Sequence, residues 1–220
     1  MLRRSLLIIC VLVAGIALSL GCGYAQEKPN APDGQNKKSY VVLKGGIFYP
    51  RGDLDELSTG FNGEVAYGYQ FHPNAAVELG SGYLQTNGTF RQITNGVGVK
   101  VEDEVYAIPL TAAIKGIVRP GKNTELYALI GGGAYIVNGK ETVSAGGRSV
   151  SMKDTTVVPG GFVGAGASYD ITENIFLGLE GKYTFTGEAT LKDTLAGVGD
   201  VRANFEIQGF TGTVNLGIRF

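Results

Sequence analysis

The sequence predicts an all-β protein, an eight-stranded antiparallel up-and-down transmembrane β-barrel preceded by a cleavable signal peptide. Three observations predict it. Between residues 39 and 220, eight segments alternate apolar and polar residues with a period of two, as strands with one apolar face do. The links between these segments are alternately short and long. Beyond the first 25 residues, the sequence contains no apolar run long enough for a membrane-spanning helix.

Residues 1–25 have the composition of a secretory signal peptide. Arg3-Arg4 supply the positive charge, an apolar run follows from Leu6 to Leu20, and Gly23-Tyr24-Ala25 offers small residues to a signal peptidase. Cleavage after Ala25 would remove both cysteines of the chain. Lipidation of Cys22 is the alternative, and it is disfavoured because the residue three positions before this cysteine is not aliphatic.

The remainder divides into a tail and a barrel. Residues 26–38 are polar, contain two prolines and show no apolar periodicity, which predicts a flexible N-terminal tail. The barrel is predicted over 39–220. Strong turn residues mark its short links, which are 72–74, 119–123 and 170–174. Long loops are expected at about 50–62, 84–105, 137–158 and 187–207. Three short turns and four long loops, with both termini on the short side, suit eight strands.

Ionisable residues of the eight segments fall on the face opposite the apolar one. An eight-stranded barrel is only wide enough for its own side chains to fill it, and an enclosed charge is costly unless it is paired. Four positive and four negative residues therefore predict an internal ion-pair network: Lys44, Glu64, Glu78, Lys115, Glu125, Glu180, Lys182 and Arg219. The alternative is a narrow or gated ion path along the same charges.

Aromatic residues on the apolar face gather near the two ends of the segments. Rings with an apolar body and a polar edge suit the two headgroup layers of a membrane, so two girdles are expected. One comprises Tyr69, Phe71 and Tyr169, with the terminal Phe220. The other comprises Tyr49, Tyr83, Tyr106, Phe185 and Phe210.

The C-terminal segment and the one before it carry a family resemblance. Gly212–Phe220 alternates strictly and ends on an aromatic residue, its apolar positions being Val214, Leu216, Ile218 and Phe220. Residues 171–185 form a polar turn that leads into an apolar/charged alternation and then a tyrosine. In these features the chain resembles the OmpA/OmpX/OmpW-type small barrels and the wider family of bacterial outer-membrane β-barrel domain proteins.

The resemblance implies a location and a set of partners. We expect a monomer in the outer membrane of a Gram-negative bacterium, with the long loops outside and both mature termini in the periplasm. The four apolar C-terminal positions would form the signal read by the barrel-assembly machinery. Membrane lipid and lipopolysaccharide are the expected partners of the outer wall. An external protein or surface ligand of unknown identity is the remaining partner.

The function expected from these features is a structural or surface-interaction role, with a plugged lumen and external loops available for binding. A minor channel for small, possibly apolar solutes, as in the OmpW-like barrels, is the alternative. A soluble carrier barrel of the lipocalin type would place its apolar face inward, which the parity of the charged residues opposes.

Enzymatic, metal and nucleic-acid functions find little support in the sequence. The one histidine, His72, falls in a short turn between Phe71 and Pro73, on the periplasmic side of the predicted layout, and is expected to be a solvated turn residue rather than a general base. We predict no catalytic residue, no metal ligand and no cofactor. A formal net charge of −1 gives no basic surface for nucleic acid. Arg51-Gly52-Asp53 matches a tripeptide that integrins bind, but it also suits a turn.

Overall fold

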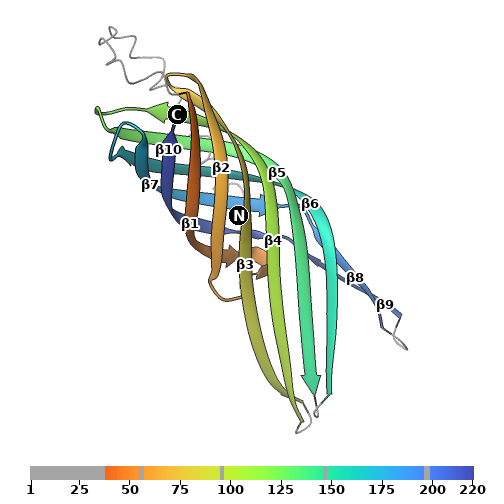
Figure 1. Cartoon of the computed structure of the whole chain (residues 1–220). Helices are drawn as coiled ribbons and strands as arrows, with labels where there is room; N and C mark the ends of the chain where they lie inside the picture. Colours follow the sequence, from red (N-terminus) through yellow and green to blue (C-terminus); the bar gives the residue numbers. More distant parts are fainter. Residues whose placement is uncertain (1–37, 55–56, 95–96, 146–147, 196–198) are drawn as a thin grey trace, which may run out of the picture. The chain divides into compact units, whose positions relative to one another are not determined.

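A computed structural model describes residues 38–54, 57–94, 97–145, 148–195 and 199–220. Within these ranges, eight strands form a closed barrel in the order β1-β10-β7-β6-β5-β4-β3-β2, which confirms the predicted fold class (Figure 1). The barrel strands are β1 (Ser39–Arg51), β2 (Gly60–His72), β3 (Ala75–Thr94), β4 (Val97–Val118), β5 (Thr124–Ala145), β6 (Arg148–Asp170), β7 (Ile175–Thr186) and β10 (Gln208–Arg219). The predicted signal peptide and residues 26–37 of the predicted tail lie outside the described ranges.

The remaining elements lie in two of the connections. A 3₁₀ turn, η1 (Gly52–Leu54), follows β1. Strands β8 (Ala189–Leu195) and β9 (Gly199–Phe205) pair only with each other and form a separate hairpin between β7 and β10. In the described part of the chain, no helix has the length and apolar character needed to cross a membrane.

The barrel closes between its first and last strands. Strands β1 and β10 pair antiparallel from Tyr40 opposite Arg219 to Arg51 opposite Gln208. At the end of this seam, the Phe220 amide donates to the Ser39 carbonyl at 2.9 Å, and the Ser39 amide donates to the Phe220 carbonyl at 3.3 Å. The ladder therefore runs around the whole ring and leaves no unpaired edge in the wall.

The wall is apolar outside, as the alternation predicts. Outward positions carry large apolar side chains that are exposed on the outer surface of the barrel, for example Leu43, Ile130 and Leu179. The Leu179 side chain is 65% exposed. The alternate positions are buried inside the ring, as the pattern of β10 shows over its whole length. This sidedness suits a barrel surrounded by lipid.

The two ends of the barrel differ. The predicted short turns lie between β2 and β3, β4 and β5, and β6 and β7, and this short-turn end also holds Ser39 and Phe220. The opposite end, which we call the long-hairpin end, carries the connections after β1, β3, β5 and β7.

The prediction of long loops is wrong at two of the four positions, where the structure has paired barrel strands. At 84–105 and 137–158 the strands continue, with β3 paired to β4 up to Thr94 opposite Val97 and β5 paired to β6 up to Ala145 opposite Arg148. Figure 1 shows these hairpins continuing past the ends of β1 and β2. The sequence still alternates there, but positions in phase with the lipid-facing residues become polar, as at Lys100 and Glu102. The prediction identified strands by apolar residues at every second position, on the side expected to face lipid, and it therefore missed these continuations.

The closing seam provides a test with two adjacent glycines. A Cβ added at Gly46 would lie 1.9 Å from the Gly212 carbonyl oxygen across the seam, whereas one added at Gly45 would meet nothing within 4 Å. We expect Gly46→Ala to destabilise the barrel by about 1–3 kcal/mol, because the strands must move apart to admit the methyl group. Gly45→Ala should leave the stability nearly unchanged. Urea unfolding in lipid vesicles, followed by the mobility of unheated samples on gels, measures both; equal stability of the two variants would contradict the close approach.

Candidate functional site: the barrel lumen

The centre of the lumen is organised around Lys44 of β1. Its Nζ lies 3.0 Å from Glu180 Oε2, 3.2 Å from Glu78 Oε2 and 3.6 Å from Glu64 Oε1. All four side chains are buried, and they come from the four strands β1, β2, β3 and β7. One ammonium group therefore bridges three carboxylates from different parts of the ring.

Two further lysines extend this group in opposite directions. Lys182 Nζ lies 2.5 Å from Glu64 Oε2. Lys115 Nζ lies 3.3 Å from Glu78 Oε1 and 3.7 Å from Glu125 Oε1. Positive and negative groups thus alternate from one ion pair to the next, so that each buried charge has an opposite charge beside it.

Glu125 carries the series to the short-turn end. Its Oε2 lies 3.0 Å from Arg119 Nη2 and 3.5 Å from Arg219 Nη2. Arg219 also forms an ion pair with Asp170, and Arg119 donates a hydrogen bond to the Pro73 carbonyl at 2.5 Å. Arg119 and Asp170 were not among the predicted lumen residues because each stands at the edge of a turn, where the strand parity gives no signal.

We refer to these connected groups as the lumen ion chain. It has five cationic and five anionic members: Lys44, Lys115, Lys182, Arg119 and Arg219, with Glu64, Glu78, Glu125, Glu180 and Asp170. The structure brings all eight predicted lumen charges into this single set. Since its positive and negative formal charges balance, the lumen ion chain needs no added counter-ion.

Neutral groups complete the coordination of the central carboxylates. The Tyr40 hydroxyl donates to Glu78 Oε1 at 2.6 Å, and the Tyr127 hydroxyl donates to Glu180 Oε2 at 3.1 Å. Lys115 Nζ lies over both rings, 3.8 Å from the centroid of Tyr127 and 5.2 Å from that of Tyr40. Hydrogen bonds to charged acceptors and cation–π contacts are strongest where water is excluded. Neither tyrosine was predicted, although both fall in the inward phase of their strands.

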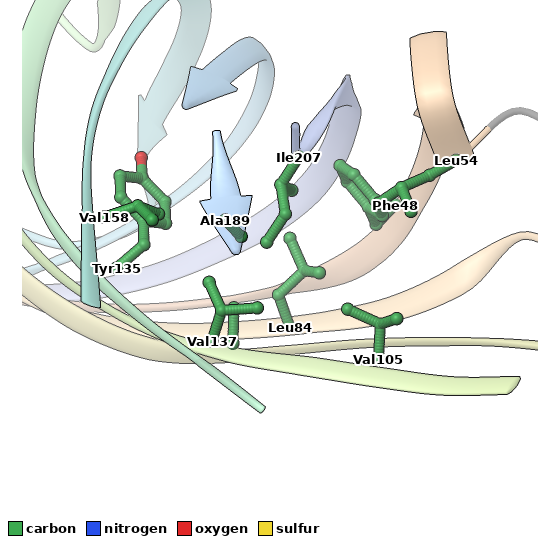
Figure 2. Close-up of a cluster of buried hydrophobic side chains, with 10 residues drawn as sticks. Phe48, Leu54, Leu84, Val105, Tyr135, Val137, Val158, Ala189 and Ile207 are labelled. Carbon is green, nitrogen blue, oxygen red and sulfur yellow. The ribbon is translucent and has the colours of Figure 1, made fainter. Parts of the chain in front are cut away.

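An apolar cluster fills the lumen at the long-hairpin end, and the sequence analysis missed it. Figure 2 shows Ile207 between Ala189 and Phe48, close to Leu84. Phe48, Val137 and Ile207 are fully buried, at 0% exposure. The full cluster comprises Phe48, Leu54, Leu84, Val105, Ala107, Tyr135, Val137, Val158, Ala189 and Ile207. Leu54 and Ile207 come from predicted loops. A large apolar residue isolated in a polar loop was the one feature of the sequence that could have indicated their burial.

The predicted aromatic residues lie on the outer wall. Apart from the terminal Phe220, the two girdles comprise eight predicted residues, and seven of them are exposed there. Phe61, which was not predicted, and the C-terminal Val214, Leu216, Ile218 and Phe220 are exposed as well. The eighth, Tyr106, is half-buried and stacks on Tyr83 with 5.9 Å between ring centroids. The seven are Tyr49, Tyr69, Phe71, Tyr83, Tyr169, Phe185 and Phe210.

The residues considered for enzymatic or metal chemistry make local contacts. His72 Nδ1 accepts a hydrogen bond from the Asn74 amide at 3.2 Å and so belongs to the turn between β2 and β3. Among the described residues, no cluster of three or more His, Cys, Asp and Glu side chains could hold a metal ion.

Residues 14–220 match the family model for the outer membrane protein beta-barrel domain. The chain belongs to this family. Its closed eight-stranded ring and apolar outer wall are those of such a domain, and the protein is located in the outer membrane. No curated protein matches the sequence.

Solved structures of other bacterial outer-membrane proteins share the fold at low sequence identity. OprG from Pseudomonas aeruginosa is 14% identical with a TM-score of 0.56, covering 85% of this chain and 98% of its own. A major outer membrane protein from Thermus thermophilus is 12% identical with a TM-score of 0.55, covering 84% and 100%. The outer membrane protease OmpT from Escherichia coli is 10% identical with a TM-score of 0.51, covering 84% and 94%. At these identities the likeness shows the fold alone.

Removing the central cation tests the energetic role of the lumen ion chain. We expect Lys44→Met to destabilise the barrel by about 3–5 kcal/mol, because three buried carboxylates would lose their shared partner. Lys122→Met, at an exposed turn position, is the matched control and should change the stability by less than about 0.5 kcal/mol. Unfolding in urea, measured by circular dichroism in lipid vesicles, compares the two. Similar effects of both substitutions would show that the ion pairs contribute little.

Proposed function

We propose that the protein is a non-conducting outer-membrane barrel with a structural and surface-interaction role. In this proposal the long-hairpin end faces the outside of the cell, and the short-turn end faces the periplasm with both mature termini. Lipid and lipopolysaccharide surround the wall, and the protein acts as a monomer. The exposed C-terminal set of Val214, Leu216, Ile218 and Phe220 serves as the signal for the barrel-assembly machinery.

The burial of charged and apolar side chains inside the ring supports the non-conducting role. Members of the lumen ion chain lie inside the ring from Lys182 to Glu125, and the buried apolar cluster around Ile207 lies at the long-hairpin end. A permeating ion would have to displace paired charges and then pass fully buried apolar side chains, and both steps are costly in a space without bulk water. The lumen ion chain therefore acts as an internal brace and plug.

The long-hairpin end supports the surface-interaction role. The β3–β4 and β5–β6 hairpins are built from strands of 20 to 23 residues, and the β8–β9 hairpin adds a further element at the same end. External segments held on a rigid barrel are a frequent location of binding functions.

A minor channel for small apolar solutes is the second candidate. The apolar cluster is the observation that favours it, because Leu84, Val105 and Val137 line the wall where such a solute would enter. This candidate requires the lumen ion chain to open.

Planar-bilayer recording separates the two candidates. We expect the purified protein to give no steady conductance, since the paired charges and the apolar cluster both fill the lumen. A porin reconstituted in the same way is the positive control. Steady single-channel steps from the wild-type protein would instead support the channel.

Insertion of an epitope tests the proposed orientation. An epitope placed between Gly146 and Gly147, after β5, should bind antibody on intact cells, whereas one placed at Gly121, between β4 and β5, should bind only after the outer membrane is permeabilised. The reverse pattern would overturn the orientation and, with it, the surface-interaction role.

A further inference from the structure

The apolar cluster at the long-hairpin end has two kinds of members. Most belong to barrel strands and form the wall, as Phe48, Leu84 and Val137 do. Leu54, Ala189 and Ile207 belong to connections or to the β8–β9 hairpin, and they cover the wall residues (Figure 2). We call these three residues the lid. None of the three takes part in the strand pairing of the barrel, so Leu54 and Ala189 can separate from the wall without breaking its ladders.

The lid is formed by two segments that are far apart in the sequence. Leu54 ends η1 after β1, and Ile207 directly precedes β10. Ile207 is bound to the end of β7, since its amide donates to Thr186 Oγ1 at 2.9 Å and its carbonyl accepts from the Thr186 amide at 3.0 Å. The Leu54 segment is held at β3, where the Ser58 amide donates to the Asn87 carbonyl at 2.9 Å, and a separate attachment joins it to the Ile207 segment.

The tripeptide Arg51-Gly52-Asp53 provides that attachment. Asp53 Oδ2 accepts a hydrogen bond from the Glu206 amide at 3.0 Å, which joins the segment before Leu54 to the residue before Ile207. Gly52 has a φ of 67°, a conformation that favours glycine and turns the chain inward at this point. Arg51 pairs with Gln208 in the ladder, and its guanidinium lies 5.6 Å from the centre of the Tyr49 ring.

We propose that Arg51-Gly52-Asp53 is a latch that holds an apolar lid closed over the outer mouth of the lumen. Each residue has a distinct part in it. Arg51 ends the ladder, Gly52 makes the turn, and Asp53 binds the opposite segment through a single side-chain hydrogen bond. Since that bond lies at the surface and water can compete for both of its partners, it is the contact in this assembly that opens most readily.

This role differs from adhesion through the same three residues. An adhesive tripeptide would present Asp53 and Arg51 to a receptor, whereas here the aspartate already accepts a backbone amide and the arginine lies against an aromatic ring. The two roles also require different chemistry at residue 53. A latch needs an acceptor oxygen, which asparagine also supplies, whereas adhesion depends on the carboxylate charge.

Thiol labelling beneath the lid tests the proposal. Val137→Cys places a thiol at a wall position that is fully buried under the lid. The chain without this substitution measures the labelling that does not come from residue 137. A polar maleimide is added to the protein in detergent, so the assay does not depend on the orientation proposed above. In the chain that carries Val137→Cys, Asp53→Ala should raise the labelling rate on the order of tenfold, because the hydrogen bond that joins the two segments is lost.

Two variants serve as controls for the latch. Asp53→Asn keeps an acceptor oxygen and should label near the wild-type rate. Glu188→Ala removes an exposed carboxylate from the other segment at the same end and should also label at the wild-type rate. Equal labelling of Asp53→Ala and the wild type, or an equal increase in Asp53→Asn and Asp53→Ala, would overturn the proposal.

A second variant and a second measurement complete the test. If Asp53→Ala fails to give the fast-migrating folded band on gels, Ile207→Ala tests the lid from its apolar side, and it should also raise the labelling rate. An unchanged rate in that variant would overturn the lid. The lid and the proposed non-conducting role fail separately: Asp53→Ala should still be silent in planar bilayers, because the lumen ion chain beneath the lid is intact. Conductance in that variant would contradict the plug without affecting the labelling result.

Discussion

The rest of the molecule depends on one constraint: every backbone peptide group in the membrane must find a hydrogen-bond partner where there is no water. Hydrocarbon offers no partner to a peptide group, so each strand in the membrane must pair on both edges, and the wall must join β1 to β10. Closure with eight strands leaves a lumen only wide enough for side chains. The two faces of the wall consequently meet opposite requirements. The outer one must be apolar, and the inner one must fill its space and pair every charge that it encloses.

The lumen ion chain follows from the second requirement and also fixes the strand register. A slip of one residue in any strand would turn its inward charge toward lipid and its outward apolar residue toward the lumen. Lys44 contributes from β1, Glu64 from β2, Glu78 from β3 and Glu180 from β7, so one cluster specifies four strands together. An apolar lumen of equal volume would fill the space without specifying the register in this way.

Much of this arrangement could be predicted because period-two alternation determines which face a residue occupies. The inward placement of Lys44 and Glu180, and the outward placement of Leu216, follow from parity alone. Parity fails where strands end. It gave no account of Arg119 and Asp170 beside the turns, or of Leu54 and Ile207 in the connections. The prediction also required an apolar residue at each outward position, and so missed the continuation of β3 and β4, where the sequence has polar residues in that phase. Contacts between connections depend on tertiary packing, which no local pattern records.

The separation in sequence of the central ion pair bears on how the barrel forms. Lys44 and Glu180 are 136 residues apart, and they belong to the first barrel strand and the seventh. Their contact therefore cannot exist until nearly all of the wall has been made, and contacts of such long range are slow to form. During biogenesis these charges must stay hydrated or be screened by other groups. Their neutralisation then coincides with completion of the ring, which gives a finished barrel an energetic advantage over a partly assembled one.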